Sequence, residues 1–122
     1  MAAPNIVNVA TITGITTGRA LTTALTTALV MNPASSGKVF KVNSIVVSNV
    51  DGSSAADASI EFYDASATAA TRIASTVAVP ADSTLIVVDK NASLYLEEGT
   101  KLVGGASANS DLEAVISYEE IS

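Results

Sequence analysis

The sequence contains no cysteine, histidine or tryptophan, and its only aromatic residues are three tyrosines and two phenylalanines among 122 residues. Without cysteine and histidine the chain has no disulfide, no thiol nucleophile, no structural zinc site and no histidine-dependent catalysis. Charged residues are scarce as well, at 15% against about 25% in ordinary soluble domains. We therefore expect a protein that is not an enzyme and holds neither a metal ion nor a cofactor.

Composition also disfavours two classes of partner. The net charge is −6 and the isoelectric point is near 4.3, so attraction to the phosphates of nucleic acid is not expected. No stretch reaches the roughly 18 apolar residues that a membrane-crossing helix needs, and the first residues lack the basic and apolar regions of a secretory signal. The sequence predicts a protein made in the cytoplasm that binds neither nucleic acid nor a membrane.

Charge is unevenly spread along the chain. Residues 1–50 hold three basic residues and no acidic one, whereas residues 51–122 hold the other three basic residues and all twelve acidic ones. Before Lys38 the only charged side chain is Arg19. A solvated surface normally carries more charge than this. Two interpretations stay open: hydroxyl groups keep this segment soluble, or it is covered by its own subunit, a neighbouring molecule or a larger shell.

Short segments rich in valine, isoleucine and threonine, with turn residues about every 8–12 residues, indicate an all-β fold. The predicted strands are residues 6–13, 38–50, 58–63, 72–79, 84–88, 93–96, 101–103 and 112–121. This pattern favours an antiparallel β-sandwich, jelly-roll-like or Greek key, with an extended N-terminal segment. In residues 38–50 the apolar side chains fall on both faces, as in a central strand. Glycines punctuate the first predicted strand at Gly14 and Gly18, and another strand opens into Gly104 and Gly105.

Residues 20–31 allow two interpretations. Leu21, Leu25 and Leu29 recur every four residues, which is a helical spacing, but the threonines between them are poor helix formers. Extended structure is favoured from Thr26 to Met31, and the helical alternative stays open. No linker divides the chain into two domains. We expect residues 37–122 to form the body of one sandwich and residues 1–36 to form an extended segment or arm that can hold the first strands.

The low charge of the N-terminal segment makes it the predicted interface. The apolar positions expected to meet a partner are Ile6, Val7, Val9, Ile12, Leu21, Leu25 and Leu29. An alanine-rich core with few aromatics is thin, and burial between subunits would supplement it. We therefore expect a homo-oligomer, either a dimer or a trimer.

Two motifs resemble catalytic or phosphate-binding sequences in part. Ser35 and Lys38 have the spacing of a serine activated by a lysine, but they precede a predicted strand where that chemistry expects a helix. Residues 32–39 resemble a phosphate-binding loop, but Asn32 replaces its first glycine and Val39 its closing serine or threonine. Neither motif predicts a site.

The acidic residues suggest no shared site either. Asp51 and Asp57 flank a loop that could supply oxygen ligands to a hard cation, although Asp-Gly is an ordinary turn dipeptide. The acid pairs at 97–98 and 119–120 are neighbours in sequence, and neighbours in a strand point to opposite faces. We expect solvated strand ends at both pairs. The five aromatics are too few and too scattered for a sugar-binding platform.

Five segments follow one another in a recognisable order, with a strand, a Val-Pro-Ala turn, a Leu-Glu-Glu-Gly turn and a final strand. They are residues 37–52 (GKVFKVNSIVVSNVDG), 59–64 (SIEFYD), 77–85 (VAVPADSTL), 94–99 (LYLEEG) and 117–121 (SYEEI). In this order the chain from about residue 36 onward resembles a group of small virion proteins from tailed bacteriophages of marine bacteria and cyanobacteria. Residues 1–35 resemble the group less distinctly.

This resemblance implies a structural protein of the virion. Within that class it favours a capsid decoration (cement) protein on the capsid exterior, which binds the major capsid protein and stabilises its shell. The group has no catalytic residues to transfer to this chain. A structural β-sandwich of the tail, neck or fibre of the same virion is the alternative. A ligand- or carbohydrate-binding module is a remote alternative from another class.

Overall fold

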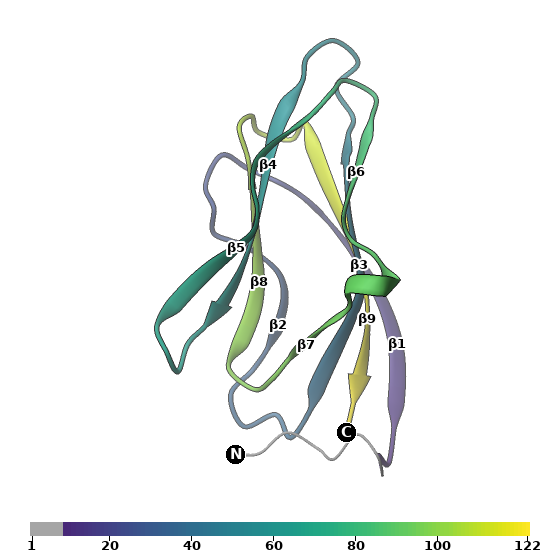
Figure 1. Cartoon of the computed structure of the whole chain (residues 1–122), viewed down its shortest axis with the longest axis vertical. Helices are drawn as coiled ribbons and strands as arrows, with labels where there is room; N and C mark the ends of the chain where they lie inside the picture. Colours follow the sequence, from purple (N-terminus) through teal and green to yellow (C-terminus); the bar gives the residue numbers. More distant parts are fainter. Residues whose placement is uncertain (1–8) are drawn as a thin grey trace.

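The computed structural model describes residues 9–122, which form two antiparallel β-sheets packed face to face (Figure 1). The strands are β1 (Ile12–Ala20), β2 (Thr27–Asn32), β3 (Val39–Asn49), β4 (Ala56–Asp64), β5 (Ala69–Val79), β6 (Thr84–Val88), β7 (Leu94–Leu96), β8 (Thr100–Ala106) and β9 (Leu112–Ile121), with a single 3-10 turn, η1 (Lys90–Ala92), in the described part of the chain. Sheet A has the order β1-β9-β3-β6, with β7 also paired to β3, and sheet B has the order β2-β8-β4-β5. The predicted all-β sandwich is confirmed.

The strand order is that of a long hairpin rolled up on itself. β1 pairs with β9, β2 with β8, β3 with β6 and β7, and β4 with β5, always antiparallel. Rolling this ladder brings β9 beside β3 in one sheet and β8 beside β4 in the other. This is the strand arrangement of a jelly roll. The first and last strands therefore lie side by side at one edge of sheet A (Figure 1).

The core lies between the sheets and draws apolar side chains from both of them. Its largest fully buried apolar residues include Leu21, Ile45, Ile60, Leu96, Leu102, Leu112 and Ile116. Phe40 and Tyr118 are its two buried aromatic rings, and they stack with 5.3 Å between ring centroids. Branched aliphatic residues thus supply most of the buried volume, which agrees with a composition poor in aromatics.

A β-bulge in β3 explains its unusual apolar pattern. The pairing of β3 with β9 shifts register between Val42 and Ser44. A bulge inserts one extra residue into the strand. Before it the even-numbered side chains point into the core, and after it the odd-numbered ones do. Phe40 and Val42 before the bulge, and Ile45 and Val47 after it, are consequently all buried in one core. The bulge thus keeps four apolar residues on the inner face of β3, while Val46 lies on its outer face, so apolar residues occupy both faces as predicted.

Four glycines that the sequence placed at the ends of strands lie inside strands. β1 runs through Gly14 and Gly18, and β8 runs through Gly104 and Gly105. At position 104 a Cβ atom would lie 3.0–3.2 Å from three core side chains, those of Leu21, Leu29 and Ile60. Such distances are tighter than most packed carbon contacts, so the three side chains would have to shift by a few tenths of an ångström. Glycine makes room for these core side chains, and the strand continues through it.

The first two strands belong to different sheets, and the chain crosses between them at residues 21–26. The crossing is held by backbone hydrogen bonds from Leu21 N to Leu112 O (2.9 Å) and from Ala106 N to Thr22 O (2.8 Å). β2 then begins at Thr27, so the extended interpretation of this segment is confirmed and no helix forms in residues 20–31.

A buried asparagine closes one end of the sandwich. Asn32, the last residue of β2, is fully buried. Its Nδ2 donates to the carbonyl oxygens of Lys38 and Leu96, both at 2.9 Å, and its Oδ1 accepts from Ser36 Oγ at 2.5 Å. One side chain therefore joins the β2–β3 loop to the end of β7.

A second buried asparagine closes the opposite end. Asn49, the last residue of β3, donates from Nδ2 to the carbonyl oxygens of Ser54 (3.0 Å) and Val79 (2.8 Å). Its Oδ1 accepts from the backbone N of Asp51 at 2.9 Å. Asn49 thus joins the end of β3 to the β3–β4 loop and to the end of β5.

Ionisation of Tyr118 makes the stability of the fold depend on pH in the alkaline range. Burial raises the pKa of its phenol above 10.0, the charge of Glu120 raises the pKa further, and Lys38 acts in the opposite direction. Because the folded-state pKa lies above the unfolded-state value, stability is fully present below pH 10 and decreases as the pH rises through the folded-state pKa.

We expect Tyr118→Phe to weaken this alkaline loss, because the variant has no phenol to ionise in the unfolded chain. Urea unfolding measured between pH 8 and 11 would give the free energy of unfolding at each pH. Tyr95→Phe removes the hydroxyl of an exposed ring and is the control for the loss of a phenol as such. Equal profiles for Tyr118→Phe and wild type would contradict the prediction.

Candidate functional site

An apolar row crosses the outer face of sheet A. Gly18 of β1 lies opposite Val115 of β9. Val115 lies opposite Val46 of β3, and Val46 lies opposite Ile86 of β6. Directly paired residues share a face of the sheet. These four residues, which we call the apolar row, therefore run from one edge of sheet A to the other, and their neighbours in each central strand point into the core.

The apolar row is accessible to a partner. Val115 is 45% exposed and Ile86 is 63% exposed, and Val46 between them is half-buried. Four of the seven large apolar residues exposed in the described part of the chain lie on this face: Ile12, Ile86, Tyr95 and Val115. Single apolar residues on a surface are ordinary, but a contiguous apolar group marks an interaction site.

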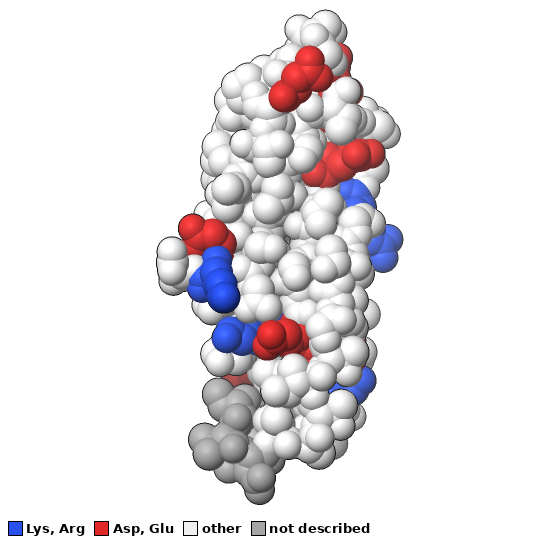
Figure 2. Space-filling view, turned by 90° about the vertical axis from the view of Figure 1, so that its right-hand side faces the viewer, with Lys and Arg blue, Asp and Glu red and all other residues white. Residues whose placement is uncertain are grey.

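Little charge surrounds the apolar row. In the paired rows on this face the charged residues are Lys41, Glu113 and Glu119. Between them lie hydroxyl residues, including Thr16, whose Oγ1 donates to Ser117 Oγ at 3.4 Å. Figure 2 views the molecule from the side where Figure 1 shows sheet A, and the acidic and basic groups form small separated clusters on an uncharged surface. Few charges would have to lose water if this face were covered.

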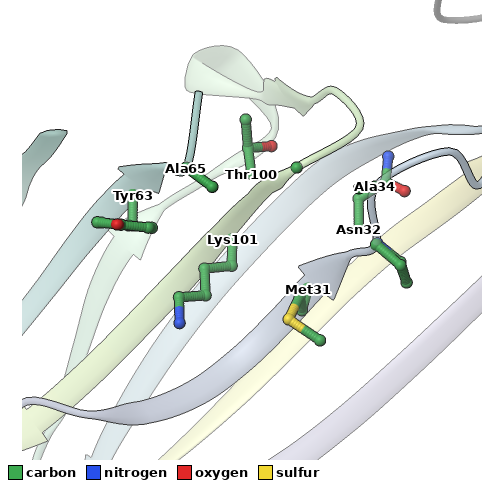
Figure 3. Close-up of a pocket in the computed structure, with 9 residues that line it drawn as sticks. Met31, Asn32, Ala34, Tyr63, Ala65, Thr100 and Lys101 are labelled. Carbon is green, nitrogen blue, oxygen red and sulfur yellow. The ribbon is translucent and has the colours of Figure 1, made fainter. Parts of the chain in front are cut away.

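The outer face of sheet B has two open depressions, and sheet A has one of about 250 Å³ lined by Gly18, Glu113 and Val115. The first depression on sheet B, of about 200 Å³, lies between the ends of β2, β4 and β8 and is lined by Met31, Tyr63 and Lys101 (Figure 3). The second, of about 210 Å³, includes Leu25 and Arg72. The Arg72–Glu61 ion pair, with 3.1 Å between Nε and Oε2, also lies on this sheet.

The aromatic ring of the first depression is already engaged. The ammonium group of Lys101 lies over the ring of Tyr63, 5.3 Å from its centroid. Figure 3 shows the Lys101 side chain lying between Tyr63 and Met31. Sugar-binding sites need a ring face free for stacking, so this depression gives little support to the carbohydrate-binding alternative.

The serine and lysine of the candidate catalytic motif are separately accounted for. Ser35 lies exposed in the β2–β3 turn with a φ of 61°. The Lys38 ammonium group forms an ion pair with Glu120, 3.0 Å from Nζ to Oε1. The Lys38 side chain is thus engaged with a carboxylate of β9.

The acidic residues also have structural partners. Asp51 Oδ1 accepts from both the backbone N and the hydroxyl of Ser53 at 3.0 Å, which is a local turn interaction. Glu98 Oε2 accepts from Gly37 N at 2.7 Å and so anchors the β2–β3 loop. Within residues 9–122, no three acidic side chains gather as a metal site would require.

The predicted interface residues separate into different environments. Ile6 and Val7 lie outside the described residues. Ile12 is 57% exposed on the outer face of sheet A, and Val9 and Leu25 are half-buried. Leu25 packs against Gly105 on the outer side of sheet B, where a Cβ on the glycine would lie 3.1 Å from it.

Leu21 and Leu29 require a correction. Both are buried in the core of their own chain, at 0% and 4% exposure. Leu21 directly follows β1 and Leu29 lies within β2, and both side chains pack in the core between the sheets, so a partner cannot reach them. The four-residue spacing of Leu21, Leu25 and Leu29, which left a helix open, instead spans the crossing between the sheets.

Sequence reasoning missed the apolar row. Val115 was detectable in principle, because it interrupts the polar side of the alternating segment 112–121, where Glu113, Ser117 and Glu119 are its neighbours. Val46 and Ile86 carry no such signal. Their alignment with Val115 depends on the register between strands, and register is not visible in one sequence.

The chain matches no protein-family model, no curated protein and no solved structure. Among the described residues, no helix has the length and apolar character needed to cross a membrane.

Proposed function

We propose that this protein is a structural component of a tailed-bacteriophage virion, a decoration protein that binds the major capsid protein on the outside of the capsid shell. The outer face of sheet A is the shell-contacting surface. The observation that carries the proposal is the apolar row, exposed on a face with few charges. The five ordered segments of residues 37–121 support the same class of protein through their resemblance to phage virion proteins.

Two further features support an assembly role. The sequence has no histidine and no cysteine, and the lysine of the Ser35/Lys38 motif is paired with Glu120. The jelly roll is a frequent architecture of viral capsid proteins, although lectins and cupins share it. A protein that contributes one modest surface many times over a shell gains avidity from repetition.

A tail, neck or fibre component is the second candidate, because the same sandwich could serve there. Copy number separates the two. Shell positions give on the order of hundreds of copies per particle, whereas tail and neck positions give roughly six to a few dozen. Quantitative mass spectrometry of purified particles, together with a density map, measures this directly. Absence of the protein from purified particles would refute both candidates.

We expect Val115→Asp and Ile86→Asp each to weaken binding to the shell at least about tenfold, which is about 1.4 kcal/mol or more. A charge in the middle of an apolar contact loses its water without gaining a partner. The measurement is co-sedimentation of purified protein with shells that lack it. Both side chains are exposed, so the free energy of unfolding should change little.

Met31→Asp is the matched control, since Met31 is comparably exposed at 55% but lies on the outer face of sheet B. It should bind shells like wild type. Weak binding of Met31→Asp combined with wild-type binding of the two sheet A variants would assign the contact to sheet B and overturn the proposed surface.

A further inference from the structure

The sandwich has several strand edges, and they are not equally protected against pairing with another chain. In sheet B, β2 contains a register shift, and β5 contains two and has Thr76 at a φ of 47°. At one side of sheet A, β6 and β7 are only five and three residues long. Short strands and bulges are the usual means of preventing edge pairing. Three of the four edges therefore carry a protective feature.

β1 at the other side of sheet A carries none. Its nine residues pair with β9 in one uninterrupted register, without a bulge. It contains no proline, and its one charged residue is Arg19. Within the part of the chain that the structure describes, no strand pairs with the other side of β1. A long, regular and nearly uncharged edge is a template for a further strand.

The hydrogen-bond pattern shows which backbone groups are free at this edge. Thr11 exchanges two backbone hydrogen bonds with Ser122, at 2.9 and 3.1 Å, and Leu21 N donates to Leu112 O. Odd-numbered residues therefore direct their N–H and C=O groups toward β9. In an antiparallel strand the alternate residues direct theirs to the other side. The free groups of β1 belong to Ile12, Gly14, Thr16, Gly18 and Ala20.

These free groups are arranged symmetrically about Thr16. Antiparallel pairing of β1 with an identical strand about a two-fold axis at Thr16 places Gly14 opposite Gly18 of the second copy and Ile12 opposite its Ala20. Every free group then meets an equivalent one, and none is left over. Arg19 lies opposite Thr13, so no like charges meet. The two glycines present no side chain where the backbones approach, a role that glycine often has within strands.

We infer that the free edge of β1 binds a second copy of this chain, forming a two-fold dimer with β1 antiparallel to β1 and Thr16 on the axis. The two A sheets then become one continuous sheet, with the apolar rows of both copies on the same outer face. The inference does not depend on the proposed function, because dimerisation is a property of the purified chain alone.

The free edge can be blocked without touching the pairing of β1 with β9. In Thr16→Pro the lost N–H is one that faces the free edge, so the intrachain ladder remains intact. Sedimentation velocity should show wild type as a dimer and Thr16→Pro as a monomer, with thermal unfolding confirming that the variant is folded. Thr84→Lys, an exposed threonine at the other side of sheet A, should remain dimeric.

Charge exchange tests the register. Thr16→Lys and Thr16→Glu each place two like charges on the axis and should be monomeric, whereas their equimolar mixture should recover the dimer. The chain has no cysteine, so Thr16→Cys provides a specific crosslink. Paired Cα atoms about 5.5 Å apart are within the range of a disulfide, and oxidation should give a covalent dimer that Thr84→Cys does not give.

Several results would overturn the inference. These are a wild-type monomer at all accessible concentrations, a dimer that persists in Thr16→Pro, loss of the dimer in Thr84→Lys, and a failure of the Lys and Glu variants to combine. The inference would also be wrong if the chain were a monomer whose β1 edge pairs with a strand of a different protein. The edge would then be a binding site for that protein and not a dimer interface.

Discussion

Leu21→Ala is expected to lower the free energy of unfolding by about 3–5 kcal/mol. Leu21 is fully buried, and its side chain reaches the space that Gly104 leaves open in sheet B. Truncation leaves a cavity in a core with few large residues to fill it. Urea unfolding of the purified chain measures the effect. If Leu21 were an interface residue, the stability of the isolated chain would not change and only partner binding would decrease.

Ile12→Thr is the matched control, because Ile12 belonged to the same predicted interface but is exposed and its replacement keeps a β-branched side chain. Its effect should be about 0.5 kcal/mol or less. An equally large loss of stability in Ile12→Thr would contradict the separation of the two residues into surface and core.

The contact between Gly104 and Leu21 can be tested within the same experiment. Gly104→Ala alone should cost about 1–3 kcal/mol, because its Cβ would overpack the core. In the double variant the alanine at 104 occupies space vacated by Leu21, so the combined loss should be smaller than the sum of the two single losses. Additive losses would show that the two residues do not share that space.

Asn49→Ala is expected to lower the free energy of unfolding by about 2–4 kcal/mol. The carbonyl oxygens of Ser54 and Val79 would lose their donor, and the N–H of Asp51 would lose its acceptor. Buried polar groups left unpaired cost their full loss of hydration. Asn91→Ala, at an exposed position, should change stability little. Similar losses in both variants would mean that the buried network is not the cause.

Asn32→Ala should have a comparable effect at the other end of the molecule. The eleven-residue strand β3 runs from the loop that Asn32 holds to Asn49 at its end, which corresponds to roughly 35 Å of strand. Effects at such distances are additive. The double variant should therefore lose the sum of the single effects, and a markedly smaller loss would indicate that the two ends unfold as one network.

Local sequence patterns were sufficient for strands with clean alternation between clear turns. The predicted bounds of 84–88 and 112–121 are those of β6 and β9, and the prediction for β3 differs by one residue at each end. In these segments the preference of each residue agrees with its burial. The sandwich class follows from the number and spacing of such segments.

The glycines show where local patterns fail. Glycine favours turns when only the chain nearby is considered, but Gly104 lies within β8 because Leu21, Leu29 and Ile60 occupy the space beside it. These residues are distant in sequence. The apolar row was missed for the same reason, since the bulge in β3 and the shift between Ile45 and Val46 determine which side chains align.

The pairing of β1 with β9 also has a consequence for how the protein reaches its native state. Among the strands that the structure describes, the ribosome makes β1 first and its partner β9 last, and the ladder joins Ile12 to Ile121. Closing so large a loop is entropically costly, and folds dominated by distant strand pairs form in milliseconds to seconds. During that interval a nascent β1 has both of its edges unpaired. On a polysome carrying many copies, capture of β1 by its own β9 competes with capture by a neighbouring chain, so the rate of synthesis becomes a determinant of correct assembly.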